Sequence, residues 1–169
     1  ELFERDYAVK WYINQQELSN RIRDDKKIIG GIDMSDGIGK DSITLVMTAE
    51  EDLGLLGILA IKETNILNFI DWVCDLMVKY PNLILIPENK HTGVVLIDAL
   101  LIRLPALGID PVKRIYNRIV DENLIHDEKY EPAFQPLQRR PQRFYEQCKT
   151  MFGYRTSGSG HHARNKLYV

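Results

Sequence analysis

The sequence predicts an α/β fold: a mixed sheet, built from a three-stranded antiparallel meander and parallel strands, flanked by helices. Three observations favour this class. Apolar, β-branched runs alternate with turn residues between positions 27 and 62, two apolar stretches with helical spacing follow, and a short, wholly apolar run lies between those two. With 169 residues, of which 44% are hydrophobic and 27% charged, the chain can bury one full core.

The meander is predicted from residues 27–62. Ile28, Ile29 and Ile32 suit a buried strand, and the glycines of the following polar turn supply the backbone freedom that a tight turn needs. A second β-branched run continues to residue 47, and the run LGLLGILAIK at 53–62 is predicted as the third strand.

Two helices and one buried strand are predicted next. Thr64 caps a helix whose apolar residues keep a 3.6-residue period until Pro81 ends it. Residues 82–87 (NLILIP) are typical of a strand buried in a parallel layer beneath helices. An almost wholly apolar helix at 94–104 follows, and Pro105 ends it. A meander, a crossover helix, a parallel strand and another helix make an α/β sandwich.

The remaining segments carry weaker patterns. Residues 1–26 are predicted to be a lead-in or linker that packs on a domain at 27–169. Within an irregular, proline-bearing stretch, a short strand is predicted at 114–120. A helix is expected at 141–153, and residues 154–169 are predicted to be a basic, glycine-rich loop.

Composition excludes several classes. No apolar run approaches the length of a membrane span, and no segment has the pattern of a secretory signal, so no membrane partner is expected. Cys74 and Cys148 lie in apolar helical patterns, which favours two reduced core residues over a disulfide.

Three carboxylates fall at and after the end of the first predicted strand: Asp33, Asp36 and Asp41. This spacing is either an ordinary Asp- and Gly-rich turn or half of a metal site. A nucleotide-binding P-loop is excluded because Asp41 separates Lys40 from Ser42. An EF-hand is excluded because glycine comes fifth rather than sixth and no Glu closes the loop. Neither argument excludes a third interpretation, in which Asp33 lies on a strand of a ribonuclease H-like or actin-like ATPase sheet.

A second carboxylate, Glu88, ends another buried strand, and Asn89, Lys90 and His91 extend the polar patch. In an open sheet, a site is built where two strand ends lie on the same edge. Carboxylates without His or Cys at ligand spacing select Mg²⁺ or Mn²⁺, and a pair of such ions suits phosphodiester hydrolysis. The residues therefore describe a metal-dependent nuclease.

Charge is distributed unevenly along the chain. Residues 138–169 hold seven Lys or Arg against one acid, whereas the remainder holds 15 against 23. Such a patch suits a nucleic-acid backbone, or else it is a solvated surface that balances an acidic body. The residues predicted to contact DNA are Lys90, His91, Arg139, Arg140, Arg143, Arg155, His161, His162, Arg164 and Lys166.

Three stretches together resemble the C-terminal nuclease domain of the large terminase subunit of tailed bacteriophages. They are GIDMSDGIGKDS at 31–42, LILIPEN at 83–89 with the Thr-Gly pair at 92–93, and GYRTSGSGHHARNKLY at 153–168. The resemblance implies a ribonuclease H-like fold and cleavage of concatemeric viral double-stranded DNA during genome packaging, in the host cell cytoplasm. It also implies a preceding ATPase domain in a longer chain, with the portal and the small terminase subunit as partners.

The resemblance also implies a set of ligands. Asp33 would bridge two Mg²⁺ or Mn²⁺ ions, Glu88 would be the second ligand, and Asp41 and Asp36 would assist, with no organic cofactor. The family's third acid is expected beyond Val169, or another acid substitutes for it. Two further hypotheses stay open: a Holliday-junction resolvase-like nuclease, and a non-catalytic module that docks DNA or a capsid through the basic loop.

Overall fold

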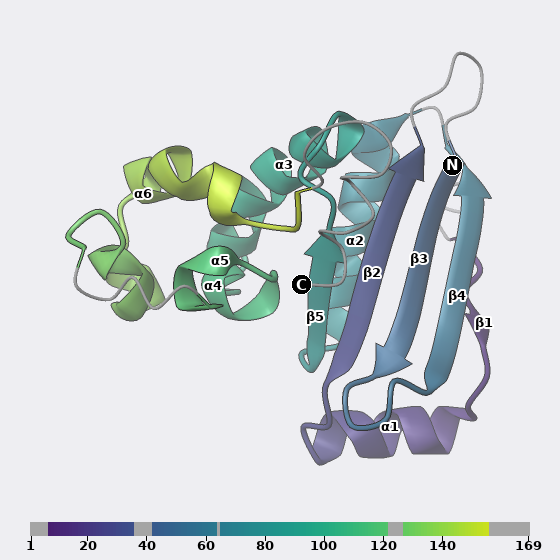
Figure 1. Ribbon diagram of the computed structural model, residues 1–169. Helices are drawn as coiled ribbons and strands as arrows, with labels where there is room; N and C mark the ends of the chain where they lie inside the picture. Colours follow the sequence, from purple (N-terminus) through teal and green to yellow (C-terminus); the bar gives the residue numbers. More distant parts are fainter. Residues whose placement is uncertain (1–6, 36–41, 64, 122–126, 156–169) are drawn as a thin grey trace. The chain divides into compact units, whose positions relative to one another are not determined.

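The computed structural model describes residues 7–35, 42–63, 65–121 and 127–155, and Figure 1 shows its elements. The chain divides into two compact units, Glu1–Ile86 and Pro87–Val169. The described elements of the first unit, with the strand that closes it, are β1 (Lys10–Trp11), α1 (Gln15–Arg23), β2 (Ile28–Ser35), β3 (Ser42–Ala49), β4 (Leu55–Lys62), α2 (Ile66–Lys79) and β5 (Leu83–Pro87).

The first unit is built on a mixed sheet that has five strands among the described residues, in the order β1-β4-β3-β2-β5. The strands β2, β3 and β4 pair antiparallel, which confirms the predicted meander. The strand β5 runs parallel to β2 (Figure 1), which confirms a mixed sheet. This arrangement is compatible with a ribonuclease H-like layout.

Alternating side chains explain why the meander has one buried face. Along β3, Ile43, Leu45, Met47 and Ala49 are buried, while the residues between them are partly exposed. This is the period of two that a strand with one core-facing side requires. On β2, a Cβ placed on Gly30 would lie 3.2–3.3 Å from side chains of β3 and β5, so the core is closely packed there.

Residues 7–26 pack on the rest of the first unit through β1 and α1. The short strand β1 pairs antiparallel with β4, with Lys10 opposite Ile58. Asn14 caps α1 by accepting a hydrogen bond from the backbone N–H of Glu17 at 2.8 Å. Trp11 packs on Gly57, where an added Cβ would lie 2.8 Å from the indole ring.

The helix α2 confirms the strongest helical prediction, and it lies on one face of the sheet (Figure 1). Its cap is Asn65, whose side chain accepts from the N–H of Leu67 at 3.0 Å. Thr64, the predicted cap, lies outside the described residues. The helix buries its apolar stripe, including Phe69, Val73 and Met77.

The second unit is mostly helical in its described part. Its elements are α3 (Thr92–Ala106), α4 (Pro111–Arg114), α5 (Arg118–Asp121), η2 (Glu131–Phe134), η3 (Leu137–Arg139), α6 (Gln142–Cys148) and η4 (Lys149–Met151). The apolar helix α3 does not end at Pro105 as predicted but continues to Ala106, and Gly108 in the left-handed region (φ +76) follows the helix. The helix predicted from Pro141 is confirmed as α6, extended by one 3₁₀ turn.

The strand predicted at 114–120 is wrong. Residues there form the end of α4, an isolated bridge at Asn117 and the start of α5. Local polar groups outweigh the β-branched residues in this stretch. Asp110 caps α4 by accepting from the N–H of Val112 at 2.9 Å, and the Asn117 amide donates to the carbonyls of Val112 and Ile115 at 2.8 and 3.0 Å.

Neither cysteine forms a disulfide and both are buried, as predicted, and burial raises the pKa of the Cys148 thiol. Across the described residues, none of the helices combines the length and apolar character needed to cross a bilayer.

Candidate functional site

Asp33 lies on β2, two residues before the strand ends at Ser35 and opposite Thr44 of β3. Its neighbour Ile32 is 2% exposed and faces the core, so the alternation of the strand turns Asp33 the other way, and Asp33 is exposed. Asp33 thus falls near a strand end, as the sequence predicts. Several other predicted site residues lie outside the described residues: Asp36, Asp41, His161, His162, Arg164 and Lys166.

Glu88 directly follows β5, the neighbour of β2 in the sheet, and its side chain is half-buried. It forms a parallel bridge with Tyr154. The N–H of Tyr154 donates to the carbonyl of Pro87 at 3.0 Å, and the N–H of Asn89 donates to the carbonyl of Tyr154 at 2.7 Å. Glu88 is therefore held by backbone hydrogen bonds on both sides of it in the chain.

The Asn89 side chain points inward and also links the end of β5 to the stretch that precedes Tyr154. Asn89 is 7% exposed, and its Nδ2 donates to the carbonyls of Lys149 and Phe152 at 3.0 and 2.9 Å. A buried carbonyl or amide without such a partner costs about 1–3 kcal/mol. The amide therefore stabilises the chain at 149–154 beside the end of β5.

Two glycines lie so close to the backbone of Pro87 and Glu88 that a residue with a Cβ would not fit at either position. A Cβ on Gly93, in the first turn of α3, would lie 1.8 Å from the carbonyl oxygen of Glu88. A Cβ on Gly153, where φ is +74, would lie 2.4 Å from the carbonyl oxygen of Pro87. We refer to Asn89, Gly93, Gly153 and Tyr154 as the Glu88 clamp.

Most of the described residues that are predicted to contact DNA are exposed. Lys90 and His91 lie in the turn between β5 and α3, and His91 has φ +51, a positive value that few residues other than glycine adopt. Arg139, Arg143 and Arg155 are also exposed in the second unit. The charged groups of these three arginines face solvent.

Arg140 is placed differently from the prediction. Its side chain is 0% exposed and forms an ion pair with Asp110 at 2.5 Å. Further bonds from its guanidinium reach the Tyr145 hydroxyl and the carbonyls of Pro132, Ala133 and Gln135. A buried guanidinium has to satisfy its donors internally. Arg140 therefore holds η2 and Gln135 in place, and its side chain does not reach the surface of this structure.

The donors of the predicted metal site are hard oxygens. The carboxylates of Asp33 and Glu88 are the ligand type that Mg²⁺ and Mn²⁺ prefer, so these two residues fit the expected cation. Asp33 lies in the first compact unit and Glu88 in the second. Within the described residues no three His, Cys, Asp or Glu side chains gather as a metal site, and two of the four predicted ligands fall outside those residues.

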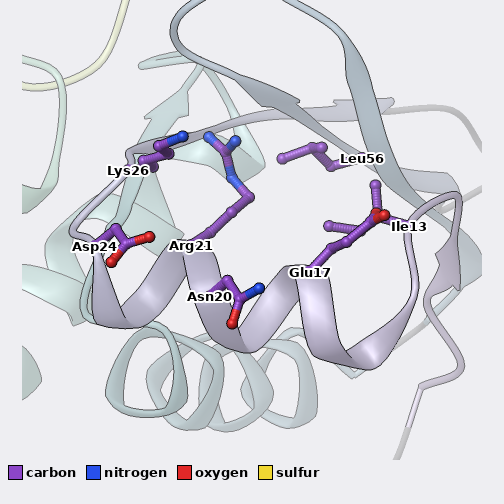
Figure 2. A pocket seen from close by; sticks show the side chains of 7 residues that line it. All are labelled: Ile13, Glu17, Asn20, Arg21, Asp24, Lys26 and Leu56. Carbon is purple, nitrogen blue, oxygen red and sulfur yellow. The ribbon is translucent and has the colours of Figure 1, made fainter.

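A pocket of about 230 Å³ lies over α1 (Figure 2). Its lining residues are Ile13, Glu17, Asn20, Arg21, Asp24, Lys26 and Leu56. Arg21 donates to both carboxylate oxygens of Glu51, at 2.5 and 3.0 Å, which raises the pKa of Arg21 and lowers that of Glu51 to about 2. The pocket lies where β2 begins, whereas Asp33 lies near the end of that strand, so the pocket is not the predicted metal site.

Sequence reasoning missed how Asn89 and Gly153 act. The sequence places Asn89 in a polar patch and Gly153 at the end of the helix expected at 141–153, and it indicates no contact between the two stretches. The available signal was weak: an amide directly after a buried apolar strand, and a glycine whose partner is far away in the chain. Contacts between distant stretches are not visible in local patterns.

The structure is that of an α/β protein. Its first unit carries Asp33 near the end of β2, and its second unit carries Glu88 in a tightly held stretch of backbone. No protein-family model matches the chain, and no match was found among curated proteins.

Proposed function

We propose that this chain is a metal-dependent DNA endonuclease domain of the type found in large terminase subunits of tailed bacteriophages. The observation that carries the proposal is the placement of two acids in the sheet order. Asp33 is exposed near the end of β2, and Glu88 directly follows β5, which is the neighbour of β2. Carboxylates at neighbouring strand ends are suited to hold a divalent cation in this class of fold.

In this proposal, Asp33 and Glu88 hold Mg²⁺ or Mn²⁺. The bound metal supplies activation of water and stabilisation of the leaving oxygen in an in-line displacement. Exposed cations, among them Lys90, Arg143 and Arg155, bind the phosphates of the duplex, so affinity falls steeply with salt. Their part is to hold the scissile strand, and they carry no base specificity of their own.

The biological setting is part of the same proposal. The substrate is concatemeric viral double-stranded DNA in the cytoplasm of the host cell, and the partners are an ATPase domain of the same longer chain, the portal and the small terminase subunit. The support is the resemblance of the residues at 31–42, 83–89 and 153–168 to that family.

Cleavage of supercoiled plasmid tests the proposal. The chain, or the chain extended past Val169, should nick and linearise plasmid with Mn²⁺ or Mg²⁺, and EDTA should stop it. Asp33→Asn and Glu88→Gln should each lower the rate by about 100-fold or more, the effect of removing one essential catalytic group. Asp75→Asn and Glu131→Gln change exposed acids of the same kinds and should leave the rate within about twofold.

Two results would contradict the proposal. One is undiminished cleavage by both Asp33→Asn and Glu88→Gln. The other is absence of metal-dependent cleavage with salt-sensitive DNA binding intact, which would favour a non-catalytic docking module.

A further inference from the structure

We propose that Asn89 is a positioning residue, which holds Glu88 ready for the metal by tying the end of β5 to the chain at 149–154. This inference rests on the proposed function, because the cation is the ligand that Glu88 would hold. Asn89 itself need not touch metal or DNA, since both hydrogens of its Nδ2 are directed to backbone carbonyls of its own unit.

The need for such a residue follows from where Glu88 lies. It comes directly after β5, and its described strand pairing is an isolated bridge to Tyr154 rather than a regular ladder. A magnesium site demands ligands at about 2.0–2.1 Å in near-octahedral geometry, and supporting groups have to hold those ligands within about 0.5 Å. The backbone that carries Glu88 therefore has to be held in place from outside β5, because strand ends open readily.

Asn89 supplies such a constraint from the buried side. Its amide donates to the carbonyls of Lys149, the first residue of η4, and Phe152, the residue directly after η4. It thus holds the stretch that leads into Tyr154, whose N–H and carbonyl bracket Glu88. An apolar residue would fill the same space, but it would leave two carbonyls without these donors.

The two glycines of the Glu88 clamp make the arrangement stiff. Backbone lies against Glu88 at Gly93 and against Pro87 at Gly153, at distances where no Cβ fits. Close-packed backbone does not yield gradually, so the Glu88 clamp is either closed or locally open. A cation that binds only when Glu88 is in place must then stabilise the closed state.

Amide hydrogen exchange in the unaltered protein tests this link directly. At a Mg²⁺ concentration ten times its dissociation constant, exchange of the Asn89 and Tyr154 amides should slow by about tenfold. The amides of Lys113 and Ile115 are control sites, because they donate to Asp110 and Pro111 within α4 and its end. Their exchange should not change.

A pair of matched variants tests the converse, namely whether loss of the Asn89 hydrogen bonds weakens Mg²⁺ binding. Asn89→Leu keeps the approximate shape but removes both donors, and it should weaken Mg²⁺ binding about fivefold or more. Asn117→Leu is the control, because the Asn117 amide is 6% exposed and also donates to two carbonyls of this unit. It should change Mg²⁺ affinity less than about twofold. If Asn89→Leu does not fold, the exchange experiment decides alone.

The outcomes separate this inference from the proposed function. Mg²⁺ binding that requires Asp33 and Glu88 but leaves exchange at Asn89 and Tyr154 unchanged would overturn the positioning role and leave the nuclease proposal intact. Equal weakening by the Asn89 and Asn117 variants would also overturn it, because general destabilisation would explain both. Mg²⁺ binding that does not depend on Asp33 or Glu88 would overturn the proposed function, and the positioning role with it.

Discussion

At the scale of single residues, the surroundings of an arginine, and not its charge alone, decide whether it is structural or faces solvent. Arg140 and Arg143 lie three positions apart in a basic stretch, and the sequence predicts the same role for both. Arg143 is exposed, whereas Arg140 is buried against Asp110. Burial alone would lower the pKa of Arg140, but hydrogen bonds to Asp110 and Tyr145 outweigh it and raise the pKa above its ordinary value. Arg140 is therefore a permanently charged, structural residue.

The ion pair between Arg140 and Asp110 gives a stability prediction. Asp110→Asn keeps an oxygen that can cap α4 but removes the negative charge, so the buried Arg140 loses its counter-ion. We expect a loss of about 3 kcal/mol in the free energy of unfolding, the scale for breaking a buried pair. Urea denaturation measures it.

The control for this experiment is Glu131→Gln, which alters an exposed acid of the same unit and should cost less than about 0.5 kcal/mol. A loss below about 1 kcal/mol for Asp110→Asn would show that Arg140 does not depend on this partner.

Among the secondary-structure elements, two glycines with nearly the same positive φ differ in how much space surrounds them. Gly108 has φ +76 and open space around its Cβ position, whereas Gly153 has φ +74 and the Pro87 carbonyl at 2.4 Å. Alanine costs about 1–2 kcal/mol in the left-handed region at either site. Only Gly153→Ala also meets backbone, which adds about 1–3 kcal/mol.

The comparison of Gly153→Ala with Gly108→Ala therefore isolates the close approach at Pro87. Urea denaturation should show Gly153→Ala to be less stable than Gly108→Ala by at least about 1 kcal/mol. Equal destabilisation of the two variants would mean that the chain at residue 153 does not press on the end of β5.

The elements that the sequence predicts well are those with a clear local apolar pattern. The meander and α2 carry enough alternating or 3.6-spaced apolar residues to outweigh local exceptions, whereas β5 and α3 are nearly continuous apolar runs. The strand β1 has only two residues, and its partner β4 lies far along the chain, so no local pattern identifies it. At 114–120, capping by Asp110 and the inward amide of Asn117 override β-branched propensity, and neither effect is part of the strand pattern.

For the whole molecule, composition and element order were enough to predict the α/β class and the mixed sheet. The same reasoning placed Asp33 near the end of a strand and Glu88 directly after one, because apolar runs end abruptly at acids there. The Glu88 clamp could not be predicted, because it joins β5 to residues 149–154 through an inward amide and two glycine contacts. Burial of Arg140 likewise depends on a partner 30 positions away.

We propose that Asp33 and Glu88 hold one divalent cation, and paramagnetic broadening by Mn²⁺ in an amide NMR spectrum tests this shared site most directly. At substoichiometric Mn²⁺, the signals of Asp33 and Glu88 should broaden together, excess Mg²⁺ should reverse the effect, and Asp33→Asn should abolish it at both positions. Broadening at one residue without the other, or broadening at Glu88 that persists in Asp33→Asn, would contradict a shared site.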